Sequence, residues 1–572
     1  MPNTRLFLLI AIFACAFLMY QQWQLDYAPP PPPPAGSTAQ TATDIPETGA
    51  AAVDALVPGD VPTAPSAVDA DVPAVVSQPA VAPAEAESTG PESGQLIRVT
   101  TDVLDVDLNV IGGQVQRALL LEYPLKLKTP ELKVTLLNTD PLSRFVAQSG
   151  LVSNSHASPD HRQRYTAERT EYVLEDGQEE LIVPLTWEQD GITVVKTFRF
   201  QRGQYAVAVD HAVSNESATA WVGSDYRQMI RRRPPEPEGS GFTNPERYSF
   251  LGAGLYTADN KYEKIDFEDL DSRAVARDGT TSWVAMVQHY FVTAWVPPAE
   301  QRAQLEAQAV SVQNQQYRVR SVSPAIRVAP GENGYFTGTL FVGPKLHDQI
   351  EPLAEGLVLT VDYGIFTPFS KILYWLLDKI HSLTGNWGWA IVLLTVLVKA
   401  AFYKLSEAQY RSTAKLRKLQ PRIQQLKERY GDDRQKFNVA MMEIYKKEKV
   451  NPLGGCLPIL VQIPVFFALY WVLLESVELR QADFMLWIND LSSPDPLFIL
   501  PVINGAAMFM TTKLSPNPAA DPIQQRIFLA MPIVFSVMFA FFQAGLVLYW
   551  TVNAVLSLAQ QWFITKRIDA AG

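Results

Sequence analysis

The run WGWAIVLLTVLVKAAFY, from Trp387 to Tyr403, decides the fold class of this chain. Its length and apolar composition are typical of a membrane-spanning helix, yet it contains one charge, Lys399. A lysine at the centre of such a helix costs roughly 2.5–3.5 kcal/mol on insertion scales, and less toward either end. Two interpretations stay open. The side chain can bend back to the lipid headgroups, since Lys404 lies only about 7.5 Å further along the helix, or it serves a functional polar site.

Further apolar segments surround this run. Membrane spans are predicted at Leu6–Tyr20, Leu453–Leu474, and about 497–512, 527–542 and 545–564. Two of these segments would be roughly 24 Å long, against a hydrocarbon core of roughly 30 Å. Paired short helices favour local thinning of the bilayer, although snorkelling residues or misjudged boundaries would explain the same pattern. Together with 386–404, the segments predict a polytopic α-helical membrane protein with six spans.

The N-terminal part predicts an anchor followed by a tether. Residues 1–24 hold a single Arg5 before the apolar run and no small-x-small cleavage site, so we expect an uncleaved signal anchor. Residues 25–94 are rich in Pro and Ala and contain no Lys or Arg, which predicts a disordered, exported segment. The chain has two cysteines, Cys15 and Cys456, which excludes a disulfide framework and a Cys-based zinc site.

Charge orients the predicted spans. The net charge is −11, but the segment Lys404–Lys449 carries 13 Lys/Arg and 6 Asp/Glu, hence +7, and the remainder −18. Positive segments stay in the cytoplasm, so this segment and the basic C-terminus, with Lys566 and Arg567, are expected inside. The acidic loop after Leu474 and the region 95–353 are then outside. The prediction is an inner-membrane protein with both termini cytoplasmic.

The region 95–353 predicts a large antiparallel β-sandwich. Runs such as ITVVKTFRFQRGQYAVAVDHAV alternate apolar and polar residues between turn signals. One short helix is expected at Ala299–Gln308. The region holds five of the six histidines, scattered without metal-like spacing, and an acidic cluster, Asp266 to Asp271, interpreted as a solvated loop. Neither pattern indicates a catalytic site.

Two amphipathic segments complete the organisation. Residues 354–385 predict a linker and an interfacial helix, Phe369–Leu383, too polar to span a membrane. Residues 405–450 predict a helical hairpin, with helices Leu405–Tyr430 and Arg434–Lys449. Its positive faces are compatible with solvation, with contact to anionic lipid and with contact to ribosomal RNA, and charge alone does not distinguish these alternatives.

Several long motifs then carry a resemblance. They are KVNPLGGCLPILVQIPVFFALYWVL (449–473), QYRSTAKLRKLQPRIQQLKERYGDD (409–433), GLVLYWTVNAVLSLAQQ (545–561), SWVAMVQHYFVTAWVP (282–297) and KYEKIDFEDL (261–270). In their order along the chain they closely resemble the YidC family of bacterial membrane protein insertases. The resemblance covers the chain except for the low-complexity tether. It implies a periplasmic β-supersandwich, residues 95–353, and a five-helix insertase core, residues 386–572.

The resemblance also implies a site. Members of this family have a hydrophilic groove, open to the cytoplasm and to lipid, that carries a positive charge. That charge is usually an arginine and matches Lys399 here; a lysine lacks the planar donor fork of arginine. Groove residues also match Thr395 and the pair Tyr549 and Trp550, where Trp550 replaces an expected tyrosine. Gln462 is a further candidate for the groove lining. Taken singly, a polar residue in a span more often joins helices than forms a site.

The implied function is insertion and folding of nascent inner-membrane proteins, alone or beside the Sec translocon and its accessory subunits. The implied partners include the ribosome, bound through the hairpin 405–450 and the basic C-terminus, and anionic lipids, but no DNA. No enzyme activity, cofactor or metal is expected, and the chain has no P-loop pattern (GxxxxGKS or GxxxxGKT). Two rivals are a secondary transporter, which would need internal repeats, and a membrane-anchored sugar enzyme, which would need converging histidines and carboxylates.

Overall fold

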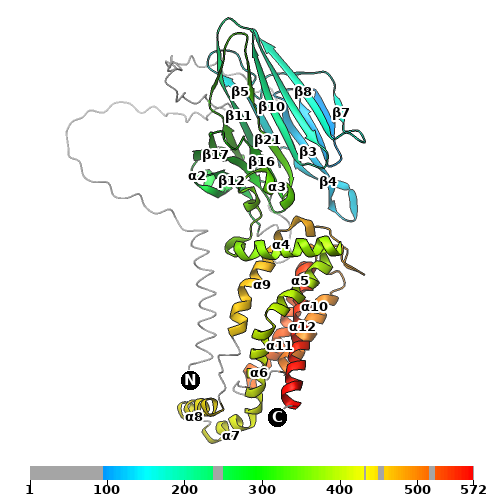
Figure 1. The fold of residues 1–572 in the computed structure, drawn as a ribbon, viewed down its shortest axis with the longest axis vertical. Coiled ribbons are helices and arrows are strands. Elements are labelled where there is room, and N and C mark those ends of the chain that lie inside the picture. The colour runs from blue at the N-terminus through cyan, green and yellow to red at the C-terminus, as the bar shows by residue number, and fades with distance from the viewer. Residues whose placement is uncertain (1–93, 236–248, 431–432, 449–456, 515–521, 571–572) are drawn as a thin grey trace, which may run out of the picture.

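The computed structural model describes residues 94–235, 249–430, 433–448, 457–514 and 522–570. The predicted anchor (1–24) and nearly all of the predicted tether (25–94) lie outside these residues. The described chain has a strand-rich half and a helical half, which meet at helix α4, Thr367–Thr384 (Figure 1).

The strand-rich half consists of two sheets. The 11-stranded sheet runs in the order β14-β17-β18-β11-β5-β3-β2-β1-β7, with β19 and β4 beside it, and the 10-stranded sheet in the order β13-β12-β15-β16-β21-β10-β9-β8-β6, with β20 beside it. Of the pairings between these strands, only β1 with β7 is parallel. The predicted antiparallel sandwich is therefore confirmed.

The strands have the following bounds: β1 Leu96–Thr100, β2 Leu104–Asn109, β3 Gln114–Lys126, β4 Thr129–Leu137, β5 Phe145–Ser153, β6 Thr166–Ala167, β7 Glu171–Val173, β8 Glu180–Gln189, β9 Ile192–Gln201, β10 Ala206–Asn215, β11 Trp221–Arg232, β12 Gly252–Thr257, β13 Lys261–Asp266, β14 Val275–Gly279, β15 Trp283–Val287, β16 Phe291–Val296, β17 Ala303–Ser311, β18 Gln316–Val322, β19 Ile326–Val328, β20 Asn333–Phe336 and β21 Thr339–Pro344.

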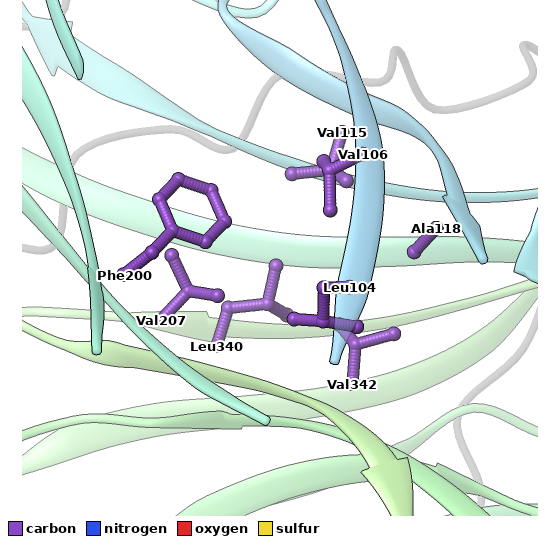
Figure 2. Close-up of a pocket in the computed structure, with 8 residues that line it drawn as sticks. All are labelled: Leu104, Val106, Val115, Ala118, Phe200, Val207, Leu340 and Val342. Carbon is purple, nitrogen blue, oxygen red and sulfur yellow. The ribbon is translucent and has the colours of Figure 1, made fainter. Parts of the chain in front are cut away.

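Alternation of side chains explains the sandwich. Along β10 every second residue is buried, because successive side chains of a strand point to opposite faces. A void of about 10 Å³ remains between the sheets (Figure 2), and all its lining side chains are apolar: Leu104, Val106, Val115, Ala118, Phe200, Val207, Leu340 and Val342. A water needs roughly 10–15 Å³ and two to four polar partners. The void is therefore a small packing gap and no ligand site.

Two local predictions in this half differ from the structure. The helix predicted at Ala299–Gln308 is wrong, because residues 303–311 form strand β17. The Ala, Gln, Leu and Glu residues of this stretch favour a helix, but Ala303, Leu305 and Ala307 alternate into the core and pairing with β18 decides the conformation. Of the acidic cluster expected in a loop, Asp266 ends strand β13 and the other acidic residues lie in the short helix α2, Phe267–Ser272.

The helices have the following bounds: α2 Phe267–Ser272, α3 His347–Leu353, α4 Thr367–Thr384, α5 Trp387–Ala401, α6 Tyr403–Lys418, α7 Gln420–Tyr430, α8 Arg434–Lys447, α9 Leu457–Glu475, α10 Ile499–Leu514, α11 Pro522–Phe539 and α12 Ala544–Ala570, with 3-10 turns η2 Leu357–Thr360, η3 Gly364–Phe366 and η5 Val477–Leu479.

No single helix among the described residues is both long and apolar enough to cross a membrane by itself. One bent pair meets that test by length and composition: Trp387–Ala401 joined to Tyr403–Ser412 at an angle of 64°. Three shorter apolar helices lie in the same half: Gln462–Glu475, Ile499–Leu514 and Arg526–Phe539.

The basic segment contains three helices where two were predicted. The long helix expected at Leu405–Tyr430 is divided into α6 and α7 at Leu419. Pro421 explains the break, since proline has no backbone N–H and its ring clashes with the preceding turn of a helix, so it is tolerated only in a first turn. Helix α7 and the preceding Leu419 pack on α8 through an apolar cluster of Leu419, Ile423, Met441 and Tyr445.

Helix α4 packs on α9 through one of its faces. Leu373 and Leu377 are buried, and the Ser370 hydroxyl donates a 3.1 Å hydrogen bond to the Ala468 carbonyl. On another face Ile372 and Trp375 are 61% and 58% exposed. The helix is therefore amphipathic, with an apolar surface left uncovered by the described chain.

A polar cluster joins the two halves, and we call it the junction cluster: the half-buried Ser249 with the buried His289, Lys345 and Glu475. The His289 Nε2 lies 3.0 Å from the Leu474 carbonyl, next to Glu475. Glu475 ends α9 and accepts a 2.9 Å hydrogen bond from Ser249. The Lys345 ammonium lies 3.7 Å from Glu475 and donates to the Thr360 carbonyl at 2.9 Å. Burial lowers the pKa of Lys345, while the nearby Glu475 carboxylate opposes that shift. Burial also lowers the pKa of His289 to about 3, so this ring is neutral.

Candidate functional site

Lys399 lies in the last turn of α5, just before the bend into α6. Asn386 caps the start of this helix, because its side chain accepts a hydrogen bond from the Trp389 backbone N–H at 3.0 Å. A cation in the last turn interacts favourably with the helix dipole. The side chain is half-buried, and its ammonium donates a 2.8 Å hydrogen bond to the Ser557 hydroxyl on α12.

One face of α12 collects the polar side chains of this region. Tyr549, Asn553 and Ser557 are spaced by four residues and therefore lie above one another on the helix. The Ser557 hydroxyl donates to the Asn553 carbonyl at 2.6 Å, and the Gln462 amide of α9 lies 3.4 Å from the Asn553 side-chain oxygen. Tyr410 of α6 adds a long contact of 3.4 Å to the Ser557 carbonyl. Side chains from α5, α6 and α9 thus converge on α12.

Thr395 lies one turn before Lys399 and is buried. Its hydroxyl donates a 2.7 Å hydrogen bond to the Ile391 carbonyl within the same helix. The donor of Thr395 is thus satisfied locally, and only its oxygen lone pairs could accept a further hydrogen bond.

The other two predicted residues belong to an aromatic layer. Trp550 stacks on Phe466 of α9 at 5.8 Å and 10°, and its ring centroid lies 4.0 Å from that of Phe539 of α11. Tyr549 contacts the same Phe466 at 6.2 Å. The Trp550 indole N–H is buried, and within the described chain no acceptor reaches it. A buried donor without an acceptor is unfavourable, so this N–H is available to an incoming polar group.

The structure therefore brings Lys399 and Gln462 to the same face of α12 and places Tyr549 and Trp550 in the adjoining aromatic layer. Sequence reasoning missed Ser557 and Tyr410. The spacing of four from Tyr549 through Asn553 was a signal that could have identified Ser557. Among the residues that the structure describes, no carboxylate forms a salt bridge with Lys399. An ammonium has three donors and Ser557 takes one, so the cation keeps capacity for an anionic group.

The strand-rich half contains a converging histidine and carboxylate, which sequence reasoning did not expect. His211 lies 3.1 Å from Asp225, whose other oxygen lies 2.7 Å from Arg227. All three side chains are buried between the sheets, with His211 0% exposed. Burial lowers the pKa of His211. A substrate cannot reach this group, and the described residues contain no cluster of three or more potential metal ligands.

The chain is similar to known proteins over its whole length. The family described as "60Kd inner membrane protein" matches residues 379–571, and the "YidC periplasmic domain" matches residues 96–376. A "Membrane protein insertase YidC" of Thioalkalivibrio sulfidiphilus is 47% identical over 100% of both chains. The protein of the same name from Methylococcus capsulatus is 45% identical over 100% of this chain and 99% of its own.

A solved structure is also similar in part. A crystal structure of an active YidC insertase covers 82% of this chain and 92% of its own, at 18% identity and a TM-score of 0.38.

Proposed function

The chain belongs to the YidC family of membrane protein insertases, and we propose that it inserts its substrates through a polar groove centred on Lys399. It is an inner-membrane protein with a periplasmic domain, it acts on nascent membrane proteins, and it is no enzyme. The single observation that carries the proposal is the hydrogen bond from the Lys399 ammonium to Ser557, on the polar face where α5, α9 and α12 meet.

The polar face lowers the cost of moving a hydrophilic segment. A nascent membrane protein must bring a short polar, often acidic, segment across lipid, and removing an ion from water costs several kcal/mol or more. Water around Gln462, Asn553 and Ser557 would remove much of that cost. The Lys399 ammonium, with donors to spare, would attract the acidic side chains of that segment.

Short helices would reduce the remaining barrier. Helix α10 has 16 residues and α11 has 18, so they are roughly 24 and 27 Å long. Against a hydrocarbon core of roughly 30 Å, these helices favour a locally thinner bilayer. The polar segment then crosses a shorter apolar layer beyond the groove.

The apolar part of the substrate would leave sideways, along α9 and α11. Ile463 and Phe467 of α9 are 40% and 43% exposed, and Ile533, Val534 and Val537 of α11 are 60–62% exposed. These faces are as apolar as the lipid chains, so an apolar substrate helix does not bind to them in preference to lipid. Transfer of the substrate helix into lipid is favourable, so it can drive the step without nucleotide hydrolysis.

The topology and further partners are part of the same proposal. We infer six spans, with residues 1–24 as the first, and cytoplasmic termini, which place residues 95–353 in the periplasm and residues 405–450 in the cytoplasm. The +7 charge of Lys404–Lys449 suits contact with ribosomal RNA and with anionic lipid. Action beside the Sec translocon and its accessory subunits is inferred from family membership.

Site-specific photo-crosslinking to a stalled nascent chain tests the groove. The crosslinker is placed in turn at Lys399, Thr395 and Trp550, and at Val555 as a matched control, because Val555 lies on α12 but is exposed outside the polar face. We expect adducts from the first three positions and little from Val555. Equal labelling from all four positions would contradict a defined groove.

A further inference from the structure

The end of the hairpin formed by β3 and β4 extends beyond the rest of its sheet. Strand β2 pairs with β3 only as far as Leu120, and past that point β4 is the remaining partner of β3. The hairpin end lies on the side of the sandwich that faces the helical half (Figure 1). We call residues 124–133, PLKLKTPELK, the finger.

The finger has one apolar and one basic face. Pro124 pairs with Lys133 and Lys126 with Thr129, so these residues share a face of the two strands. Leu125 and Leu132 belong to the other face, and each is 53% exposed. At the turn Leu127 is 44% exposed and Lys128 is exposed. Three leucines close together, all left uncovered, are unusual for a strand pair in water.

The base of the finger is fixed to the helical half. Arg480, in the segment after α9, donates a 2.7 Å hydrogen bond to the Pro124 carbonyl. The Gln481 amide donates to the same carbonyl at 2.8 Å. The Arg480 guanidinium also lies 5.8 Å from the centre of the Phe291 ring of β16. The finger therefore keeps a defined position beside the end of α9 where the junction cluster lies.

The composition of the finger suits one kind of surface. It carries Lys126, Lys128 and Lys133 against Glu131, a net charge of +2 in a chain of net charge −11. Leucines leave water when they enter the boundary of a bilayer, and lysines can then reach its phosphates with their flexible stems. Helix α4 lies between the two halves, and its apolar side chains Ile372 and Trp375 are exposed like the leucines of the finger.

We propose that the finger rests on the outer leaflet of the inner membrane, with its leucines in the interface and its lysines against anionic lipid phosphates. The proposal depends on the topology inferred above, in which the strand-rich half is periplasmic. The occupant is lipid rather than a protein because the leucines alternate with lysines. A protein partner would have to desolvate those ammonium groups and pair them.

A fluorescence experiment on the full-length protein tests the contact. An environment-sensitive probe is attached at Leu127→Cys, in a background where Cys15 and Cys456 are replaced by serine, and the protein is reconstituted in phosphatidylglycerol-containing vesicles with brominated lipid. Tyr335→Cys is the control, because Tyr335 is 67% exposed but pairs with Ala212 near the end of β10 farther from the helices. We expect several-fold stronger quenching at position 127 than at position 335.

The lysines are tested in the same assay. The triple substitution Lys126→Glu, Lys128→Glu and Lys133→Glu, or vesicles of phosphatidylcholine alone, should reduce the quenching at position 127 several-fold and leave position 335 unchanged. Equal quenching at both positions would overturn the proposal. A blue-shifted probe at position 127 without quenching would also overturn it, since a second copy or another protein would then cover the finger. Full insertion by Lys399→Glu, with quenching at position 127 intact, would contradict the proposed groove and not the finger.

Discussion

The two halves of the molecule each hold a lysine in a largely apolar setting, and the two lysines differ in exposure and in their hydrogen-bond acceptors. In the strand-rich half Lys196 is 0% exposed, and its ammonium donates to the Gly112 and Ser149 carbonyls at 2.9 and 3.1 Å. In the helical half Lys399 is half-buried and donates to the hydroxyl of Ser557. Backbone carbonyls are rigid acceptors, whereas a serine hydroxyl can rotate and also donates elsewhere.

This difference separates a structural lysine from a functional one. Lys196 is held between two sheets by fixed acceptors, so its hydrogen bonds contribute to one folded arrangement. Lys399 has donors left over, no salt bridge to a described carboxylate, and a partner, Ser557, on the α12 face that side chains of α6 and α9 also contact. Both lysines are removed from water to some degree, but within the described chain Lys399 leaves two of its three donors unused and is partly exposed, whereas Lys196 uses two of three and is 0% exposed.

The largest expected effect comes from reversing the charge in the helical half. Lys399→Glu should abolish insertion, because a carboxylate there repels the acidic segments of substrates, whereas Lys399→Arg should preserve it. Complementation of a strain depleted of its own insertase measures both variants. Full growth with the Glu variant would show that insertion does not require a positive charge at position 399.

The second effect concerns the junction cluster between the halves. Lys345→Met removes the cation beside buried Glu475 and should destabilise the protein by about 3–5 kcal/mol, because it leaves an uncompensated buried charge. Deletion of residues 95–353 should be milder, because Glu475 then returns to water. Insertion activity and the midpoint of thermal unfolding are measured for both variants. If the deletion lowers these quantities more than Lys345→Met does, the proposed role of the junction cluster is contradicted.

A third test makes the strand-rich lysine the counterpart of Lys399. Lys196→Met should lower the free energy of unfolding by about 1–3 kcal/mol, because two buried carbonyls lose their donor, and it should leave insertion by the folded protein unchanged. Burial lowers the pKa of Lys196 to about 7, below its ordinary value of 10.5. Between these pH values the unfolded chain binds more protons, so stability should rise with pH.

Denaturant titrations at pH 7 and pH 9 check the last prediction. The rise in stability attributed to Lys196 should be missing in Lys196→Met, and an equal rise in both proteins would assign it to other groups. A failure of insertion by well-folded Lys196→Met would remove the distinction between the two lysines.

The smallest effect is expected at Ser557. Ser557→Ala removes the hydroxyl that receives the Lys399 ammonium but keeps the charge, so insertion should fall only a few-fold, in line with about 1 kcal/mol for one hydrogen bond. Ser557→Thr keeps the hydroxyl and is the matched control. Loss of insertion as complete as in Lys399→Glu would show that position, rather than charge, is decisive.

Sequence alone predicted the sandwich well because its strands repeat a simple alternation, as in β9 and β10. It failed at Ala303–Ser311, where helix-favouring residues are held in a strand by pairing and burial. Pro421 was a visible signal for the break between α6 and α7, but the apolar spacing continues across it. Local propensity is a weak guide wherever tertiary contacts decide.

The candidate site was predictable in part. Lys399 stands out because a charge in an apolar run is costly, and the family resemblance pointed to Thr395, Tyr549 and Trp550. Ser557 and Tyr410 are ordinary polar residues on helices, and their contacts depend on which helices pack together. Helical periodicity defines a face of α12, but it does not say which neighbour that face meets.

The junction cluster has a consequence for the order in which the protein is made. Ser249, His289 and Lys345 all precede Glu475 in the chain, the first of them by 226 residues. During synthesis the periplasmic half can therefore be exported and folded before the carboxylate leaves the ribosome. The last turn of α9 then packs against a surface, formed by Ser249, His289 and Lys345, that has already folded. Completion of the helical half is thereby coupled to correct export of the half made earlier.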